Sequence, residues 1–181
     1  MNQAVNLTPF EILAHFERKS LAHASASPDT LEAPGLWRGI GFRVGSRLLV
    51  SGIDEISELL AVPLLTPVPG TQPWLLGVAN VRGNLVPVID FARFLFGERT
   101  LHTDRTRLLI VRQNGGNVAL LVDEVFGQRT VDAEQRRGAE LEDDPRLARF
   151  AEQRVGDGVQ QMAILSMGKL VRAPDFRQAA A

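Results

Sequence analysis

The chain has 181 residues, a formal net charge of −1, 45% hydrophobic residues and 23% charged residues. This composition is typical of a globular protein that buries a substantial core, and no run approaches the roughly 18 apolar residues that a membrane-spanning helix needs. The chain has no cysteine, which excludes disulfides, thiolate metal sites and cysteine nucleophiles. Its charge gives no general attraction to nucleic-acid phosphates, and without a recognisable secretion signal we expect a cytoplasmic protein.

Residues 1–35 are predicted to form a helical extension and a linker. Thr8 and Glu11 have the spacing of a capping box at the start of a helix. The apolar stripe Ile12–Phe16 either packs on the chain's own domain or docks on a partner. Residues 23–28, HASASP, have the composition of a linker.

From Trp37 onward, short apolar runs separated by Gly, Pro and Asn favour a mainly β domain over residues 36–172. The expected strands span 37–44, 47–52, 55–60, 63–68, 74–82, 85–90, 107–113, 117–122, 124–130 and 160–165. A helix is expected over Phe91–Phe96, with Asp90 as its N-cap and Gly97 as its C-terminal stop. The polar segment 131–159 is predicted to be a loop with one or two helical turns, and residues 173–181 a flexible tail.

An internal echo organises the expected strands. Segments 42–56 and 111–125 each contain a strand, a glycine turn, a second strand and an apolar residue followed by Asp-Glu. Each segment is followed later by an apolar strand that leads into a short helix. We therefore predict two similar small barrels, the first over about 45–95 and the second over about 105–160, with closing strands shared from the ends.

Residues 77–97, GVANVRGNLVPVIDFARFLFG, indicate a hairpin followed by that helix. With Gly83-Asn84 as the central pair of a primed turn, Arg82 lies opposite Leu85 and Asn80 opposite Pro87. Alternation then places four residues on the core face: Ala79, Val81, Val86 and Val88. Pro87 cannot donate to a ladder, so one side of its strand is expected to be unpaired or bulged there.

Arg82 shares the second face of this hairpin with Asn80, Leu85 and aliphatic residues. The pattern alone favours an arginine that pairs with a local carboxylate. The alternative is an interface residue, because arginine on an apolar rim is frequent among interface hot spots.

We find no pattern that indicates catalysis, a cofactor or a metal. The histidines at 15, 23 and 102 lack a metal-ligand spacing. In each of the pairs Asp54-Glu55 and Asp123-Glu124, the two neighbouring residues are expected to point to opposite faces of a strand. The two carboxylates of a pair therefore cannot share a proton, and we expect solvated or turn-capping carboxylates. A small-barrel binder of carbohydrate or nucleic acid remains an alternative, although such a site would use exposed aromatics and the chain has no tyrosine and two tryptophans.

The hairpin segment resembles the signature of the CheW-like domain family. The matching positions are Gly77, Asn80, Arg82, Gly83, Pro87 and Asp90. A second family stretch is similar to NVALLVDEVFG at 117–127, and the resemblance covers about residues 36–172.

This resemblance implies a mainly β fold of two packed five-stranded, Src-homology-3-like barrels. It also implies a non-catalytic adaptor that couples the cytoplasmic tip of a methyl-accepting chemoreceptor to the regulatory domain of a CheA-type histidine kinase. Such an adaptor binds no nucleic acid and does not insert directly into a membrane, but is recruited to membrane-associated receptor arrays. A runner-up is a CheW-like chaperone or regulator that holds a single partner.

By matched position, the resemblance implies that Ile53, Glu55 and Ile56 lie at or near a receptor groove between the barrels, with Arg82 beside it. The complete set of predicted interaction residues is Ile53, Glu55, Ile56, Gly77, Asn80, Arg82, Val122 and Val125. The N-terminal helix and the polar insertion over 131–159 resemble the branch of the family that serves type IV pili and twitching motility.

Overall fold

The computed structural model describes residues 9–22, 36–113, 115–137, 140–156 and 161–180. Contacts divide the chain into residues 1–34 and 35–181, and each unit is described by itself. In the first unit, helix α1 (Pro9–Ala22) forms as expected, with Phe10, Leu13 and Phe16 exposed. The expected Thr8 cap and the linker at 23–28 lie outside the described residues. None of the described helices is long and apolar enough to cross a membrane.

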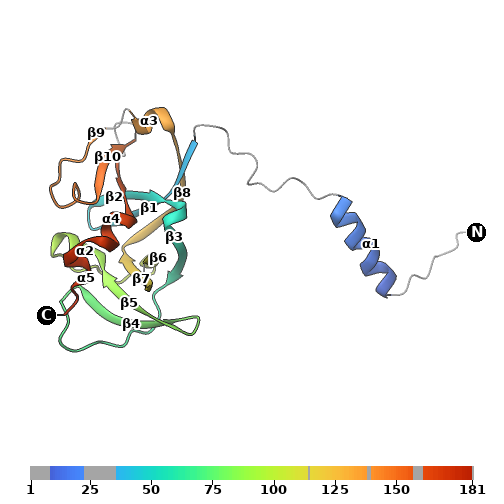
Figure 1. Cartoon of the computed structure of the whole chain (residues 1–181), viewed down its shortest axis with the longest axis horizontal. Helices are drawn as coiled ribbons and strands as arrows, with labels where there is room; N and C mark the ends of the chain where they lie inside the picture. The colour runs from blue at the N-terminus through green and yellow to red at the C-terminus, as the bar shows by residue number, and fades with distance from the viewer. Residues whose placement is uncertain (1–8, 23–35, 114, 138–139, 157–160, 181) are drawn as a thin grey trace, which may run out of the picture. The chain divides into compact units, whose positions relative to one another are not determined.

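The second unit is mainly β, as the sequence predicts (Figure 1). Its elements in chain order are β1 (Leu36–Val44), β2 (Arg47–Gly52), the 3-10 turn η2 (Ile53–Glu55), β3 (Ile56–Ala61), β4 (Leu75–Val81), β5 (Asn84–Asp90), α2 (Phe91–Phe96), β6 (Arg107–Gln113), β7 (Gly116–Val122), β8 (Glu124–Asp132), α3 (Ala133–Arg137), β9 (Glu140–Leu141), β10 (Ala151–Val155), β11 (Met162–Leu165), α4 (Met167–Arg172) and α5 (Pro174–Arg177).

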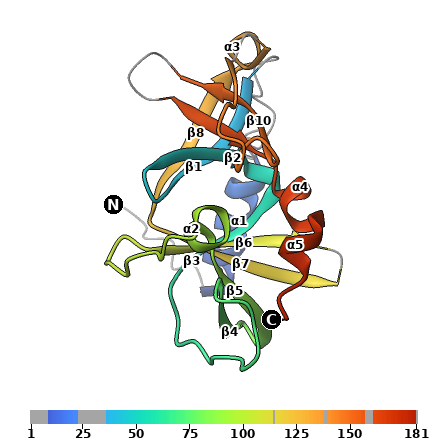
Figure 2. The same ribbon diagram turned by 90° about the vertical axis from the view of Figure 1, so that its left-hand side faces the viewer.

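These strands form two sheets. Sheet A has the order β8-β1-β2-β11-β10-β9, and sheet B has the order β3-β6-β7-β5-β4. Figure 2 shows sheet A above sheet B, with α4 and α5 beside the junction. Apart from the two-residue β9, the two sheets have matching plans, because β11 pairs with β2 in parallel as β5 pairs with β7.

The internal echo corresponds to an exchange of strands between the sheets. The hairpin β1-β2 belongs to sheet A, but the next strand, β3, crosses over and pairs with β6 of sheet B. The hairpin β6-β7 belongs to sheet B, and its next strand, β8, crosses over and pairs with β1. Each sheet is therefore completed by a strand from the other repeat.

The sheets share one central core and enclose two smaller ones. The central core joins both sheets and the helices, and includes Phe42 of β1, Leu120 of β7 and Leu170 of α4. Alternate residues of β6 point away from it, so Leu108 and Ile110 fill a second core on the far face of sheet B. Val50, Val131 and Val155 form the third core in sheet A. Burial on both faces explains why the central strands are continuous apolar runs.

Short helices follow β5 and β11, as the sequence predicts. Helix α2 has the expected bounds: the Asp90 side chain accepts a hydrogen bond from the Arg93 N–H, and Gly97 closes the helix at φ 75°. Helix α4 begins after Ser166, whose side chain accepts from the Lys169 N–H.

The boundaries of the two barrels differ from the prediction. The expected first segment, 45–95, contains β2 of sheet A, and the expected second segment, 105–160, contains β6 and β7 of sheet B. The barrels do not correspond to sequential halves of the chain, because β3 and β8 are exchanged between the two sheets. The expected strand at 63–68 is also absent from the described structure, where Thr66 forms one isolated bridge with Val78. Pro63 and Pro67 have no N–H to donate to a ladder, which explains the difference.

Two C-terminal expectations also need correction. The segment 131–159, expected to be a loop with helical turns, contains α3 but also the strands β9 and β10. Residues 173–181 were expected to be a flexible tail, yet Pro174–Arg177 forms α5 and the Phe176 side chain is 4% exposed. Phe176 stacks on Trp74 and packs edge-on against Phe94, and this aromatic burial holds the segment in place.

Candidate protein-interaction surface

The β4-β5 turn has Arg82 and Gly83 as its central pair, instead of the predicted Gly83 and Asn84. Val81 pairs with Asn84, Arg82 has φ 51° and Gly83 has φ 83°. The Asn80 side-chain oxygen accepts a hydrogen bond from the Gly83 N–H at 2.8 Å. This bond favours a turn one residue earlier in the chain, because it satisfies a backbone donor that the turn leaves unpaired.

The change of register preserves the predicted core face. Asn80 pairs with Leu85 and Ala79 with Val86, so each partner is displaced by two residues, one full period of a strand. Ala79, Val86 and Val88 are buried and Val81 is half-buried, as predicted. The ladder between β5 and β7 begins at Val88, so Pro87 precedes its first pair, in agreement with the expected unpaired side.

Arg82 is exposed and also ion-paired. Its Nη2 lies 2.6 Å from the Oε1 of Glu58 on β3, and the side chains are 79% and 22% exposed. The local carboxylate that the sequence pattern favoured is therefore present. Exposed pairs of this kind contribute only about 0–1 kcal/mol to stability. Because the Arg82 side chain stays 79% exposed in the pair, its guanidinium is available for another contact.

We define the tip surface by three of the exposed side chains at the end of the hairpin: Asn80, Arg82 and Leu85. Leu85 is 75% exposed although it is a large apolar residue. Farther from the turn the same face is buried, since Ile89 is 3% exposed. The second face of the hairpin is therefore buried at Ile89, away from the turn, and exposed and rich in hydrogen-bond donors near the turn.

Gly77, predicted as an interaction residue, is buried where the barrel of sheet B closes. The backbones of Thr66 and Val78 form two hydrogen bonds of 2.9 Å, which close the loop after β3 onto β4. Gly77 has φ 139°, and a Cβ atom there would overlap the Thr66 carbonyl oxygen. Glycine is required at this position because another chain segment approaches its backbone.

Ile53, Glu55 and Ile56 lie where the chain crosses from sheet A to sheet B. Ile53 is 42% exposed, whereas Ile56 packs against the central core. Glu55 is held internally: its Oε2 accepts from the Ser51 hydroxyl at 2.7 Å, and its Oε1 accepts from the Gly168 N–H at 3.0 Å. Glu55 therefore fixes the start of α4 against the crossover.

Val122 is a correction to the predicted interaction set. Its side chain is 0% exposed in the central core, so it cannot contact a partner in this structure. Val125 is half-buried at the edge of the same core. Of the eight predicted residues, the structure leaves Asn80, Arg82 and Ile53 exposed.

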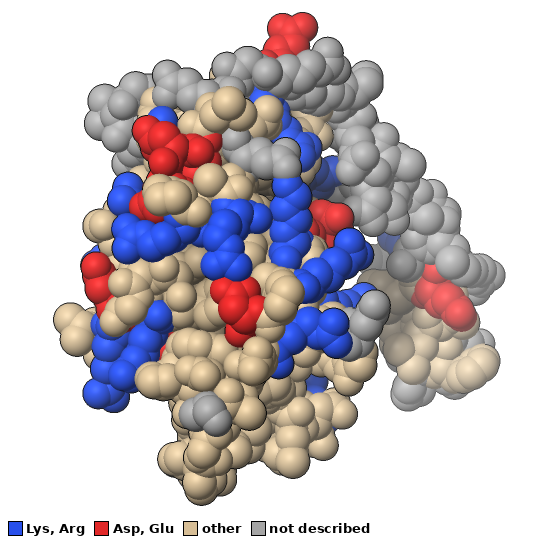
Figure 3. Space-filling view, turned by 60° about the vertical axis from the view of Figure 1, so that its left-hand side comes forward, with Lys and Arg blue, Asp and Glu red and all other residues tan. Residues whose placement is uncertain are grey.

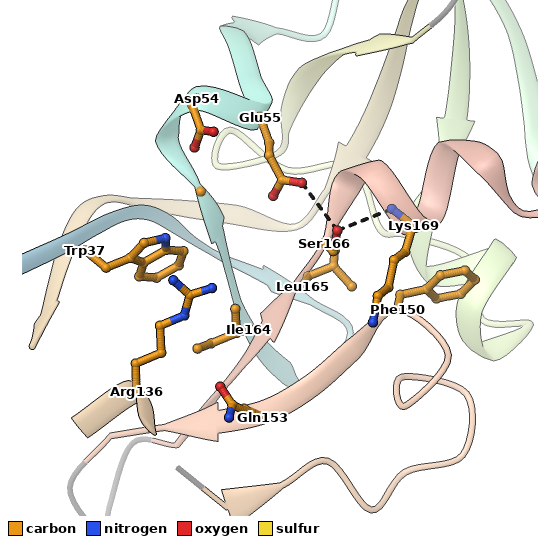
Figure 4. Close-up of a pocket in the computed structure, with 11 residues that line it drawn as sticks. Trp37, Asp54, Glu55, Arg136, Phe150, Gln153, Ile164, Leu165, Ser166 and Lys169 are labelled. Atoms are coloured by element: carbon orange, nitrogen blue, oxygen red, sulfur yellow. Dashed lines mark hydrogen bonds between the residues drawn. The ribbon is translucent and has the colours of Figure 1, made fainter. Parts of the chain in front are cut away.

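A cavity of about 340 Å³ lies beside the Glu55 crossover (Figure 4). Its walls include Asp54, Glu55, Arg136 and Lys169, and the Arg136 guanidinium lies 4.9 Å from the ring centre of Trp37. Sequence reasoning missed Trp37, Arg136 and Lys169 as neighbours because α3, α4 and β1 are far apart in the chain. A mixture of both charges with one aromatic ring suits polar side chains of a partner better than an apolar ligand.

Structural partners hold three of the echoed carboxylates: Glu55, as described above, Asp123 and Glu124. The Asp123 Oδ2 accepts from the Gly45 N–H at 2.7 Å and thus caps the β1-β2 turn, as expected. Glu124 lies 3.5 Å from Arg43 and 3.2 Å from Arg105. Within the part of the chain that the structure describes, no group of three or more metal-ligating side chains occurs.

The fold and these motifs place the chain in one family: it belongs to the CheW-like domain family, which matches residues 38–175. It is 39% identical to Protein PilI of Pseudomonas aeruginosa over 122 residues, which are 67% of this chain and 68% of that protein. It is also 34% identical to Protein FrzA of Myxococcus xanthus over 50% of this chain and 56% of that protein. The identity to PilI supports the pilus branch expected from the sequence.

A solved structure supports the fold. The scaffolding protein TtCheW of Thermoanaerobacter tengcongensis superposes with a TM-score of 0.66 and 20% identity, over 78% of this chain and 96% of that chain. The predicted CheW-like architecture is therefore confirmed, with β9 as a short addition to sheet A.

Proposed function

We propose that this protein is a non-catalytic chemosensory adaptor. It couples the cytoplasmic tip of a methyl-accepting receptor to the regulatory domain of a CheA-type histidine kinase, in a system that controls type IV pili and twitching motility. Membership of the CheW-like family and the similarity to PilI support this assignment. The same relatives do not favour the alternative of a carbohydrate or nucleic-acid binder.

The observation that carries the proposal is the backbone of Arg82. Among the described residues outside glycine, Arg82 alone has a positive φ. This conformation costs an L-residue with a long side chain roughly 1–2 kcal/mol, whereas Asn or Gly adopts it readily. The exposed ion pair with Glu58 offsets only part of that cost. An arginine in this position therefore suits a side chain that is used in binding.

The tip surface has the composition of a small hot spot. Arg82 supplies donors, and Leu85 supplies apolar area that is exposed in the isolated protein. Burying a leucine side chain contributes about 1.5–3 kcal/mol, and truncating an interface arginine can cost about 2 kcal/mol or more. Contacts of this size are individually weak, and a receptor array would strengthen them through multivalency. We expect the protein to be cytoplasmic and recruited to such arrays.

The test is capture of the kinase regulatory domain and of a receptor cytoplasmic tip by the full chain and its Arg82→Glu variant. We expect the variant to lose capture of at least one of these partners by tenfold or about 1.4 kcal/mol, while its melting temperature stays within a few degrees of the wild type. Arg112→Glu is the matched control, because Arg112 is an exposed arginine on β6 with the same charge change. Unchanged capture of both partners by Arg82→Glu would contradict the proposed role of the tip surface.

A further inference from the structure

An arginine-rich face lies over α2, α4, α5, the start of β2 and the turn before β10. Figure 3 shows Lys and Arg side chains in a band across this side of the molecule, with fewer Asp and Glu among them. We define the arginine face by six residues: Arg47, Arg93, Arg146, Arg149, Arg172 and Arg177. We propose that it binds an acidic polypeptide segment of a partner protein, at a surface separate from the tip surface.

Two of these arginines share one buried carboxylate. Asp144 is 8% exposed, and its Oδ2 lies 2.9 Å from the Arg47 Nη2 and 3.3 Å from the Arg146 Nη2. The Arg146 guanidinium also lies 5.0 Å from the ring centre of Phe96 on α2. Both guanidinium groups are thus held in place, and together they exceed the charge of Asp144 by one. A positioned guanidinium with unused donors loses less freedom when it binds a second carboxylate.

Arg149 is held in the same manner on the adjoining part of the face. Its Nη2 lies 2.8 Å from both carboxylate oxygens of Asp175, and its guanidinium lies 5.0 Å from the ring centre of Phe150. Phe150 contacts Phe94 of α2, which in turn contacts Phe176 of α5. One aromatic cluster therefore fixes the segments that carry the arginines relative to one another.

The remaining three arginines have no acidic partner within the described structure. No ion pair of Arg93, Arg172 or Arg177 is present among the described residues, and Arg172 and Arg177 are exposed. Of the six guanidinium groups, three are thus ion-paired, and they share two carboxylates, those of Asp144 and Asp175. A local excess of positive charge attracts a negatively charged surface and raises the rate of association with it. This local excess exists although the whole chain has a net charge of only −1.

The chemistry of the face favours protein over nucleic acid or membrane. The rings of Phe94 and Phe96 are half-buried, so they offer no open platform for bases. None of the exposed large apolar residues lies on α2, α4 or α5, so the face has no side chain to insert into a lipid interface.

The experiment measures binding of fluorescein-labelled poly-L-glutamate to the full chain at low salt. Arg172→Glu with Arg177→Glu reverses two unpaired charges and leaves the ion pairs of Asp144 in place, and we expect about tenfold weaker binding. The matched control is Arg112→Glu with Arg129→Glu, two exposed arginines on β6 and β8, and we expect less than about threefold change. Melting curves establish that both double variants are folded.

Three outcomes would overturn the proposal. The first is no binding of poly-L-glutamate by the wild type, and the second is equal weakening by the two double variants. The third is tighter binding of poly(A) RNA or of phosphatidylglycerol vesicles than of poly-L-glutamate, which would assign the face to a different class of partner. Because the probe is neither receptor nor kinase, failure here is distinguishable from failure of the adaptor proposal.

Discussion

Arg82 and Glu58 form a 2.6 Å ion pair that links the β4-β5 turn to β3, although β3 and β4 are opposite edges of sheet B. The pair lies on the side where the sheet curls toward closure, and the bridge between Thr66 and Val78 completes that closure. The tip surface therefore belongs to a closed barrel rather than to a free hairpin. Its stability and its binding role can be separated by substitution.

Arg82→Asn is expected to stabilise the fold while weakening partner capture. The substitution gives the Asn-Gly pair that such turns prefer and relieves the positive φ of the arginine. We expect the free energy of unfolding in urea to rise by about 0.5–1 kcal/mol, after the loss of an exposed ion pair. Arg112→Asn is the control, and no gain is expected there. A loss of stability at Arg82→Asn would show that the ion pair outweighs the backbone strain.

Gly77→Ala is expected to destabilise the protein by about 3 kcal/mol or more, because the new Cβ meets the Thr66 carbonyl and the backbone φ is 139°. Gly70→Ala is the matched control: its φ is 71°, but a Cβ there meets nothing within 4 Å. The control should lose only about 1 kcal/mol. Equal losses in chemical denaturation would mean that the close approach of Thr66 contributes nothing beyond the dihedral.

Glu55→Ala is expected to cost about 1–3 kcal/mol, because the Gly168 N–H and the Ser51 hydroxyl lose their acceptor. Hydrogen exchange of the Gly168 amide should accelerate more than that of amides in β6. The neighbouring Asp54→Ala serves as control, since Asp54 is exposed, and it should change stability by less than about 0.5 kcal/mol. If Glu55→Ala impairs partner capture without faster exchange at Gly168, the residue acts directly at an interface.

Asp144 makes stability depend on acid pH. Hydrogen bonding and charge from Arg146, with the charge of Arg47, lower the pKa of Asp144 in the folded state in spite of burial. A lowered folded pKa stabilises the protein above the unfolded pKa of about 4, and this stabilisation is lost as pH falls through the folded value. Asp144→Asn should therefore cost about 1–3 kcal/mol at pH 7, and the difference from wild type should shrink below about pH 4.

The control for this pH profile is Asp143→Asn. Asp143 is 78% exposed and pairs with Arg154 at 3.4 Å, so its loss should cost less than about 1 kcal/mol at any pH. A difference between Asp144→Asn and wild type that stays constant from pH 7 to pH 3 would assign the effect to packing instead of charge.

Phe176→Ala is expected to cost about 3–5 kcal/mol, because the ring is buried against Trp74 and Phe94. Phe10→Ala on α1 is the control, since that ring is 79% exposed, and it should leave the melting temperature nearly unchanged. A negligible effect of Phe176→Ala on stability would contradict this packing and would support the flexible tail expected from the sequence.

The sequence predicted the elements whose signals are local. Asp90 and Gly97 delimit α2 as expected, and alternation identified the core face of β4 and β5. The strand β10 was missed because AEQRV is a short polar-rich run with apolar residues only at its ends, where Ala151 and Val155 are buried in two different cores. The exact turn was missed because the hydrogen bond from Gly83 to Asn80 outweighed the preference for Gly-Asn at the centre.

The candidate site was predicted in its central residue but not in its surroundings. Arg82 is at the tip, yet its partner Glu58 is 24 residues away and belongs to another hairpin unit, so no local pattern could pair them. Gly77 matched the family signature and Glu55 was placed near the groove by matched position, but the structure gives both residues contacts inside the protein. A signature match does not distinguish residues that touch a partner from those that hold the surface in shape.

The exchange of β3 and β8 between the sheets has a consequence for how the protein unfolds. Neither repeat can complete its own sheet, since β3 pairs with β6 and β8 pairs with β1. The two halves are therefore obligate partners, and a single cooperative transition is expected in place of two. A chain cut in the loop between α2 and β6 would yield two incomplete fragments that must meet before either is folded, so the duplication visible in the sequence is no longer divisible into independent parts.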